Sequence, residues 1–264
     1  MGSRASLMAV CLAVVACGGD GAAARRAQPP VRGDTIFQDG GFTIRDDAPS
    51  TSPPTSDPAG CRRTIATADT ASNRSELGGY FYSFVDREGT RIWPVAGSDG
   101  GVFEMSPGGA EATRGAARIF GRLGTTGVNY AGMAVNLKDP KAPFDATAYD
   151  AIGFYARRGP HGVAHVRFGV PDANTDPDAK VCNECFNDFG LDVQLSESWQ
   201  RYVLPFAAMR QEAGWGSPRP SQIDKARLFS VQFKVLEREA EFDIWVDQLE
   251  FLRCQAGRAA PPGW

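Results

Sequence analysis

The stretch Phe242-Asp243-Ile244-Trp245-Val246-Asp247 begins a run that alternates in polarity as far as residue 252. Alternation with a period of two is typical of a β-strand with one buried face. Trp245, like Trp199, lies in this kind of pattern, and we expect both rings to pack in the core. Further strands are expected over residues 117–122, 130–137, 151–156, 165–170, 199–204 and 228–235.

Turn signals separate these segments, among them Gly108-Gly109, Asp139-Pro140 and Gly214-Trp215-Gly216. A short helical segment is expected only over residues 206–211. Many short strands with Gly and Pro turns, and no regular alternation of strands with helices, predict an all-β protein. We expect an antiparallel β-sandwich of about nine or ten strands.

The composition favours a binding module. The 264 residues carry a formal net charge of −3, and 42% of them are hydrophobic and 22% charged, which is ordinary for a globular protein. Proteins that bind nucleic acid present a basic face, so we expect no nucleic-acid partner. Only two His are present, which leaves little material for acid–base catalysis.

The N-terminus has the features of an export signal. Arg4 precedes an uncharged apolar run over residues 7–16, which is too short to span a bilayer as a mature helix. The run ends in Val14-Val15-Ala16-Cys17, which is similar to the lipobox of bacterial lipoproteins. The resemblance implies a signal peptide over residues 1–16 and a stable lipid anchor on Cys17. The alternative is an ordinary secretory signal with an incidental cysteine.

The same resemblance predicts an exported protein, lipid-anchored to the bacterial cell envelope, that touches the membrane through its lipid alone. Gly18 after the lipidated cysteine favours the outer membrane. Residues 17–60 are rich in Pro, Ser and Thr and are typical of a disordered tether. We expect a folded domain over residues 61–254 and a flexible tail over residues 255–264.

Four cysteines fall within or at the ends of the expected domain, and an even number in an exported chain favours two disulfides. Three pairings are open. In one of them Cys61 pairs with Cys254 and closes the domain, while Cys182 pairs locally with Cys185. A zinc site made of the same four thiols is the competing interpretation.

The second half of the chain resembles a known group of modules. The relevant strings are Asp172-Ala173-Asn174-Thr175-Asp176-Pro177, Asn187-Asp188-Phe189-Gly190, Trp199-Gln200-Arg201-Tyr202 and Phe242-Asp243-Ile244-Trp245. They resemble carbohydrate-binding-like modules of the galactose-binding-domain-like superfamily, and the family-11 cellulose-binding type is the nearest. The resemblance implies a jelly-roll sandwich but leaves the ligand open, because this superfamily also contains proteins that do not bind sugars.

The resemblance also raises the question of a structural calcium ion, the one cofactor left open. Relatives often begin the first strand with an acidic run that helps to hold calcium, whereas this chain has Ile65-Ala66-Thr67-Ala68-Asp69. Calcium prefers six to eight oxygen ligands. The remaining candidate ligands are Asp69 with Asp247, and Asp172 with Asp176 in a loop that imitates the start of an EF-hand but has Pro177 in place of the turn glycine.

Aromatic residues are candidates for sugar binding. Sugar-binding sites combine flat Tyr or Trp rings with polar groups for the hydroxyls. Tyr80 and Tyr82 would point to the same side of one strand, and Trp215 lies in a Gly-flanked loop. For each ring the alternative is packing in the core. The carbohydrate-binding candidates are Tyr80, Tyr82, Trp93, Asn129, Tyr130, Arg167, Asp188, Gln211 and Trp215.

Catalysis has little support, because the sequence holds neither a Gly-x-Ser-x-Gly nor an HExxH motif. We therefore expect a lipid-anchored envelope protein, not an enzyme, whose β-sandwich binds a polysaccharide or another glycan. Two alternatives stay open. One is a structural or protein-interaction lipoprotein without a sugar site, and the other is a glycan-active enzyme with two facing carboxylates.

Overall fold

The computed structural model describes residues 62–70, 72–95, 103–237 and 240–253. Within these ranges the chain forms twelve strands and four short 3-10 turns, and no α-helix. No helix in the described ranges is long and apolar enough to cross a membrane. The expected all-β sandwich is confirmed. Cys17, Cys61, Cys254, the expected tether and the expected tail all lie outside the described residues.

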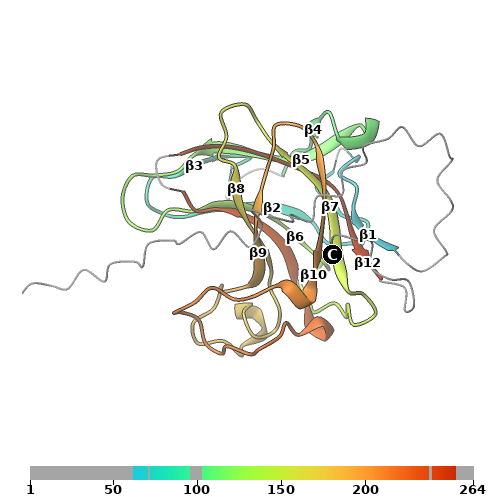
Figure 1. Ribbon diagram of the computed structural model, residues 1–264, viewed down its shortest axis with the longest axis vertical. Coiled ribbons are helices and arrows are strands. Elements are labelled where there is room, and N and C mark those ends of the chain that lie inside the picture. Colours follow the sequence, from blue (N-terminus) through green and yellow to red (C-terminus); the bar gives the residue numbers. More distant parts are fainter. Residues whose placement is uncertain (1–61, 71, 96–102, 238–239, 254–264) are drawn as a thin grey trace, which may run out of the picture. The chain divides into compact units, whose positions relative to one another are not determined.

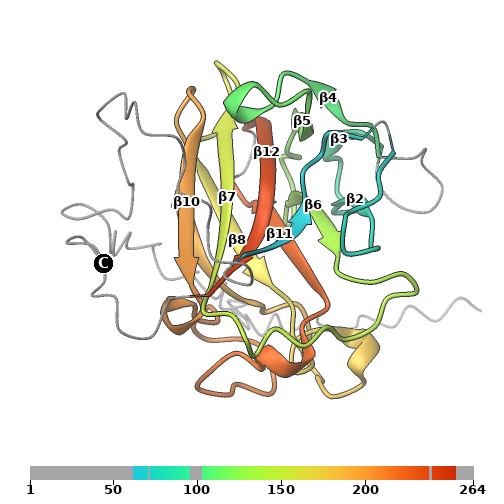
Figure 2. The same cartoon turned by 90° about the vertical axis from the view of Figure 1, so that its right-hand side faces the viewer.

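The larger sheet has seven antiparallel strands. Its path runs β10-β7-β12-β5-β3, with β1 added on β12 and β4 on β5. Figure 2 looks onto this sheet, with β8 and β11 of the other sheet behind it. The strands are β1 (Arg62–Ala66), β3 (Arg91–Trp93), β4 (Ser106–Pro107), β5 (Gly115–Arg122), β7 (Ala151–Arg158), β10 (Gln200–Pro205) and β12 (Glu241–Leu252).

The smaller sheet has five antiparallel strands in the order β2-β6-β11-β8-β9. It packs against the larger sheet to complete the sandwich (Figure 1). Its strands are β2 (Phe81–Val85), β6 (Ala131–Asn136), β8 (His165–Val170), β9 (Phe189–Gln194) and β11 (Ser230–Val235). The 3-10 turns are η1 (Ala110–Ala112), η2 (Pro177–Ala179), η3 (Phe206–Ala208) and η4 (Lys225–Arg227).

Aromatic packing fills the space between the sheets. Phe154 on β7 stacks on Phe168 of β8 at 5.2 Å between ring centroids and on Tyr202 of β10 at 5.4 Å, and it meets the edge of Phe233 of β11 at 5.0 Å. Burying a ring of this size stabilises the fold by roughly 1.5–3 kcal/mol. The inward positions of β11 are Val231, Phe233 and Val235, so Gln232 and Lys234 face outward.

The two tryptophans expected in the core lie elsewhere. Trp245 is buried, with 8% of its surface exposed, but it lies on the outer face of the seven-stranded sheet. Ile244 and Val246 occupy the inward positions of β12, so their neighbour Trp245 must point the other way. Trp199 lies beside it, with the ring centroids 6.5 Å apart. The period of two was correct, but which face was inward was not.

The strand prediction was closest for the long strands. It missed β3 and β4, which have three and two residues, and also β9, which has six. The helical segment over residues 206–211 is reduced to η3. Between β8 and β9, residues 171–188 form a long connection, here called the disulfide segment. It carries η2 and the Cys182–Cys185 disulfide, which was one of the expected pairings.

Candidate functional site

A row of aromatic rings lies on the outer face of the five-stranded sheet. Tyr80, Tyr82 and Phe84 alternate with Phe81 and Ser83, which are buried, so the three rings share the outward side of β2. The centroids of neighbouring rings are 6.1 Å apart from Tyr80 to Tyr82 and 6.3 Å apart from Tyr82 to Phe84. Each of the three is half-buried.

Tyr130, just before β6, extends the row, because its ring lies 6.4 Å from that of Phe84. Asp86 accepts a hydrogen bond from the Tyr130 backbone N–H at 2.8 Å and thereby fixes the start of β6 beside β2. We call Tyr80, Tyr82, Phe84 and Tyr130 the tyrosine face. Three of its members were predicted. Phe84 was missed, although it continues the alternation of Tyr80 and Tyr82.

Small residues of β6 leave room for two of the rings over this strand. A Cβ atom on Gly132 would overlap the Phe84 ring, so this ring lies directly over β6. Tyr82 is opposite Ala134 of β6, yet its hydroxyl reaches close enough to Ser230 on β11, the next strand, for Ser230 to lower its pKa. The Tyr82 ring therefore crosses β6.

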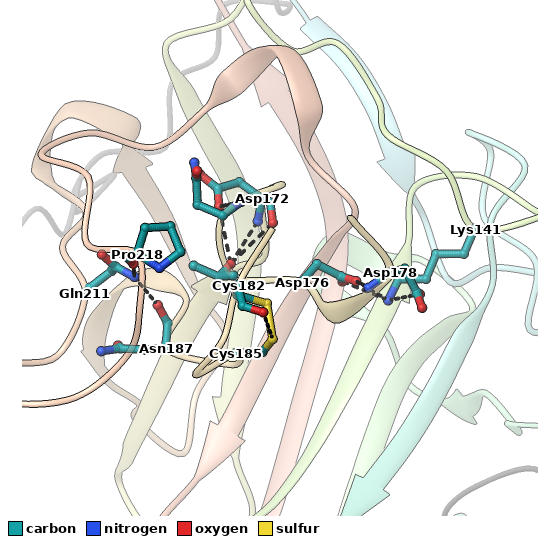
Figure 3. Close-up of a disulfide and its surroundings, with 11 residues drawn as sticks. Lys141, Asp172, Asp176, Asp178, Cys182, Cys185, Asn187, Gln211 and Pro218 are labelled. Atoms are coloured by element: carbon teal, nitrogen blue, oxygen red, sulfur yellow. Dashed lines mark hydrogen bonds and ion pairs between the residues drawn. A yellow bond between two sulfur atoms is a disulfide. The ribbon is translucent and has the colours of Figure 1, made fainter. Parts of the chain in front are cut away.

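The Tyr82 hydroxyl lies in a buried polar cluster. Burial raises the pKa of Tyr82 to about 12, although the Lys141 ammonium opposes the shift. Lys141 bridges Asp176 and Asp178 of the disulfide segment, with Nζ 2.7 Å from Asp176 Oδ2 and 2.9 Å from Asp178 Oδ2 (Figure 3). These ion pairs hold the disulfide segment against the connection that carries Lys141, close to the Tyr82 hydroxyl.

Polar side chains come from the strands beyond β6. Lys234 of β11 donates to Asp188 Oδ2 at 2.6 Å and to the Phe186 carbonyl at 3.3 Å. Burial raises the pKa of the Asp188 carboxyl, and the Lys234 ammonium counteracts this. Arg167 of β8 donates from Nη2 to the Arg210 carbonyl at 2.6 Å. The predicted candidate Arg167 thus lies on the same sheet as the tyrosine face, and Asp188 lies directly before its strand β9.

Gln211 joins its own loop to Asn187 by a hydrogen bond. Its Nε2 donates to the Asn187 carbonyl at 2.8 Å (Figure 3), and Asn187 Nδ2 in turn donates to the Trp215 carbonyl at 2.6 Å. Trp215 is 41% exposed and its indole N–H donates to Glu212 at 3.1 Å. The loop of Trp215 is therefore held next to Asp188, but its ring contacts no described ring of the tyrosine face.

Two other candidates are not brought to the tyrosine face. Trp93 lies on β3 of the other sheet, opposite Phe120, and is 47% exposed. Asn129 is buried, and its amide points to Asp86 and the Glu88 carbonyl, both at 3.5 Å. The sequence could not reveal this, because neither residue lies in a regular alternating run.

The first pair of calcium candidates does not fit a cation as it stands. Asp247 Oδ2 accepts hydrogen bonds from the Ala110 N–H at 2.8 Å and the Thr113 hydroxyl at 2.6 Å. Asp69 Oδ1 accepts from the backbone N–H of Arg114 at 2.7 Å. Donors directed at both carboxylates occupy the lone pairs that a metal ion would need.

The carboxylates of the second pair, Asp172 and Asp176, also already have hydrogen-bond or ion-pair partners. Asp172 accepts from the backbone N–H of Asn174 at 2.9 Å and of Asp224 at 2.7 Å, which fixes the turn at the start of the disulfide segment. Asp176 is ion-paired with Lys141. Within the described ranges, no three His, Cys, Asp or Glu side chains gather closely enough to hold a metal.

No protein-family model matches this chain, and no curated protein matches it. Solved structures do. A family 11 carbohydrate-binding module of a cellulosomal cellulase of Clostridium thermocellum is 13% identical with a TM-score of 0.52, over 75% of this chain and 98% of that chain. A family 11 module from the same organism, in complex with a β-1,3-1,4-mixed-linked tetrasaccharide, is 14% identical with a TM-score of 0.51, over 73% of this chain and 95% of that chain. The chain therefore has the jelly-roll fold of the carbohydrate-binding modules.

Proposed function

We propose that the tyrosine face binds a neutral glycan without catalysis. The observation that carries this proposal is the continuous row of four rings, three of them half-buried and Tyr130 exposed, of which Tyr82 and Phe84 extend over β6. The flat C–H side of a sugar ring packs on such a surface, and the tyrosine hydroxyls can bind sugar hydroxyls. The tetrasaccharide complex of a similarly folded module supports the same ligand class.

The carboxylates near the tyrosine face support a role in binding and not in catalysis. A glycoside hydrolase needs one carboxylic acid and one carboxylate that both face the scissile bond. Here Asp176 and Asp188 are buried, and each is ion-paired with a lysine. Such pairs organise the surface, and neither carboxylate is free to transfer a proton.

We further propose that Cys17 carries lipid and holds this domain on the outer membrane of a bacterial envelope. The lipobox-like string Val14-Val15-Ala16-Cys17 supports this proposal. Replacing Cys17 by Ser should move the protein from the membrane fraction to the soluble fraction, because the thioether cannot form. A variant that remains membrane-bound would contradict the anchor.

Calorimetric titration of the full chain with neutral gluco- and manno-oligosaccharides tests the glycan site. We expect Tyr82→Ala and Tyr80→Ala each to lower the affinity by about tenfold to a hundredfold, as for other buried aromatic anchors. Trp93→Ala removes an equally large exposed ring from the other sheet and is the matched control. Equal affinities of the wild type, Tyr80→Ala and Trp93→Ala would contradict the proposal and favour a protein-interaction role.

A further inference from the structure

The outer face of the seven-stranded sheet carries a ladder of rings and guanidinium groups. Trp245 of β12 is opposite Arg118 of β5 on one side and Arg157 of β7 on the other. The guanidinium carbons of Arg118 and Arg157 lie 4.4 Å and 4.0 Å from the Trp245 ring centroid. Arg157 also lies 5.2 Å from the Trp199 ring, and Arg118 lies 4.6 Å from the Phe120 ring.

The two arginines differ in their partners. Arg118 forms a two-pronged ion pair with Asp243, from Nε to Oδ1 and from Nη2 to Oδ2, both at 2.8 Å. Within the described ranges, no carboxylate lies at ion-pair distance from Arg157 and no acceptor is hydrogen-bonded to it. Burial lowers the pKa of Arg157, and the nearby Arg118 adds to this while Asp243 opposes it.

Arg157 is therefore a guanidinium that ring packing holds in place while its donors stay available. A planar guanidinium binds a carboxylate or a sulfate through two parallel hydrogen bonds. Holding it between Trp199 and Trp245 reduces the entropy that such binding would cost. On the same face Arg122 lies 3.7 Å from Glu241. Arg118 and Arg122 have carboxylate partners at ion-pair distance, whereas among the described residues Arg157 has none and feels Asp243 only from further away.

A hollow of about 320 Å³ adjoins the other end of the ladder. Its lining combines the Phe120 ring, which is 38% exposed, with polar groups of Arg118, His161, Glu241 and Asp243. An apolar surface with a few polar groups is typical of a ligand pocket, and this volume is at the small end of their range. Sugar rings combine flat C–H surfaces with hydroxyl groups and so match this mixture of ring surface, donors and acceptors.

We infer that this face is a second binding site, for an acidic saccharide whose carboxylate pairs with Arg157 and whose sugar rings pack against Trp199 and over the hollow beside Phe120. The site is separate from the tyrosine face, because it lies on the outside of the other sheet (Figure 2). It needs no property of the tyrosine face, so either site can be present without the other.

The test is calorimetric titration of the full chain with a galacturonic acid trisaccharide at low salt, with Trp fluorescence as a second readout. We expect Arg157→Gln to lower the affinity for the trisaccharide at least tenfold. Arg157→Lys should lower it less, because Lys keeps the positive charge but cannot form two parallel hydrogen bonds. Arg201→Gln is the matched control, since Arg201 also lies over a ring of this sheet but is ion-paired with Glu250 at 2.6 Å. Arg201→Gln should bind the acidic trisaccharide with the affinity of the wild type.

Two further titrations separate this site from its alternatives. Tyr82→Ala should keep the affinity for the acidic trisaccharide, and a loss there with none in Arg157→Gln would overturn the inference. A glutamate oligomer that binds Arg157 as tightly as the trisaccharide would overturn the saccharide assignment. A neutral trisaccharide that binds as tightly as the acidic trisaccharide would also overturn this assignment. Failure of neutral glycans to bind the tyrosine face would leave the result for Arg157 unaffected.

Discussion

The two outer faces of this sandwich present aromatic rings in different ways. On the five-stranded sheet, Gly132 and Ala134 lie beneath the rings, and the rings cover them. On the seven-stranded sheet, Trp245 has Arg118 and Arg157 as its cross-strand neighbours, and the guanidinium groups cover the ring. The residue across the strand therefore decides whether a ring or a cation faces the solvent.

Each outer face also holds a buried carboxylate, and the two differ in their partners. Asp188 on the five-stranded side is ion-paired with Lys234. Asp247 on the seven-stranded side has hydrogen-bond donors from Ala110, Thr113 and Gln248. Burial raises the pKa of both, to about 6 for Asp247. One buried carboxylate is compensated by a cation and the other by hydrogen bonds alone.

The largest effect is expected where the cation is removed. Lys234→Met leaves the Asp188 carboxylate buried without its ion pair, and we expect a loss of about 3–5 kcal/mol in unfolding free energy at neutral pH. The loss should shrink as the pH falls, because protonated Asp188 no longer needs the cation. Urea unfolding at several pH values measures this. Arg122→Met, which breaks an exposed pair with Glu241, is the control and should cost less than about 1 kcal/mol. Equal losses in the two variants would contradict the comparison.

The second effect is a change of the unfolding free energy with pH, caused by the buried Asp247 carboxyl. Its pKa is raised from 3.8 to about 6 by folding, so the folded state binds the proton more tightly than the unfolded state. The stabilisation from this group is complete below about pH 4 and is lost as the pH rises through 6. About two pKa units correspond to about 3 kcal/mol. The stability of the wild type relative to Asp247→Asn should fall by up to that amount from about pH 4 to pH 7. Parallel pH profiles would show that the pKa of Asp247 is ordinary.

A third change tests the position of the Tyr82 ring over β6. Ala134→Leu places a longer side chain beneath Tyr82, which should lift the ring from the sheet. We expect the affinity for neutral glycans to fall about tenfold, which is about 1.4 kcal/mol. The pKa of Tyr82 should fall from about 12 towards 10 as its hydroxyl becomes hydrated, which ultraviolet titration would detect. An unchanged affinity together with a lowered pKa would remove Tyr82 from the binding surface.

The smallest effect is expected from adding a calcium chelator. Because Asp69 and Asp247 already accept hydrogen bonds, chelation with EDTA should leave the midpoint of thermal unfolding unchanged. Scanning calorimetry with and without added calcium checks this. A midpoint that rises by several degrees with calcium would show that the hydrogen bonds of Asp247 give way to a metal ion.

The sequence predicted the elements whose alternation is long. The strands β7, β8, β11 and β12 lie within a few residues of their expected ranges, because one buried face imposes a period of two on each. The same rule placed Tyr80 and Tyr82 on one side of a strand. Alternation cannot say which side is inward, since that depends on the opposing sheet, so Trp199 and Trp245 were placed in the core.

Parts of the candidate site could not be predicted from local pattern at all. Trp93 lies on a strand of three residues, which is too short to show a period. Gln211 looked like a free amide and instead joins its loop to Asn187, a contact between residues 24 positions apart. The unpaired state of Arg157 depends on which carboxylates the neighbouring strands bring close. Only the fold decides such contacts.

The pairing of β1 with β12 has a mechanical consequence. Arg62 is opposite Leu252, and β12 lies between β7 and β5 in the interior of the seven-stranded sheet. If the protein is held by its N-terminal side while a bound partner pulls on it, the force enters at β1 and passes first to the β1–β12 hydrogen bonds. This one pair of strands is therefore the first part of the fold to bear the load.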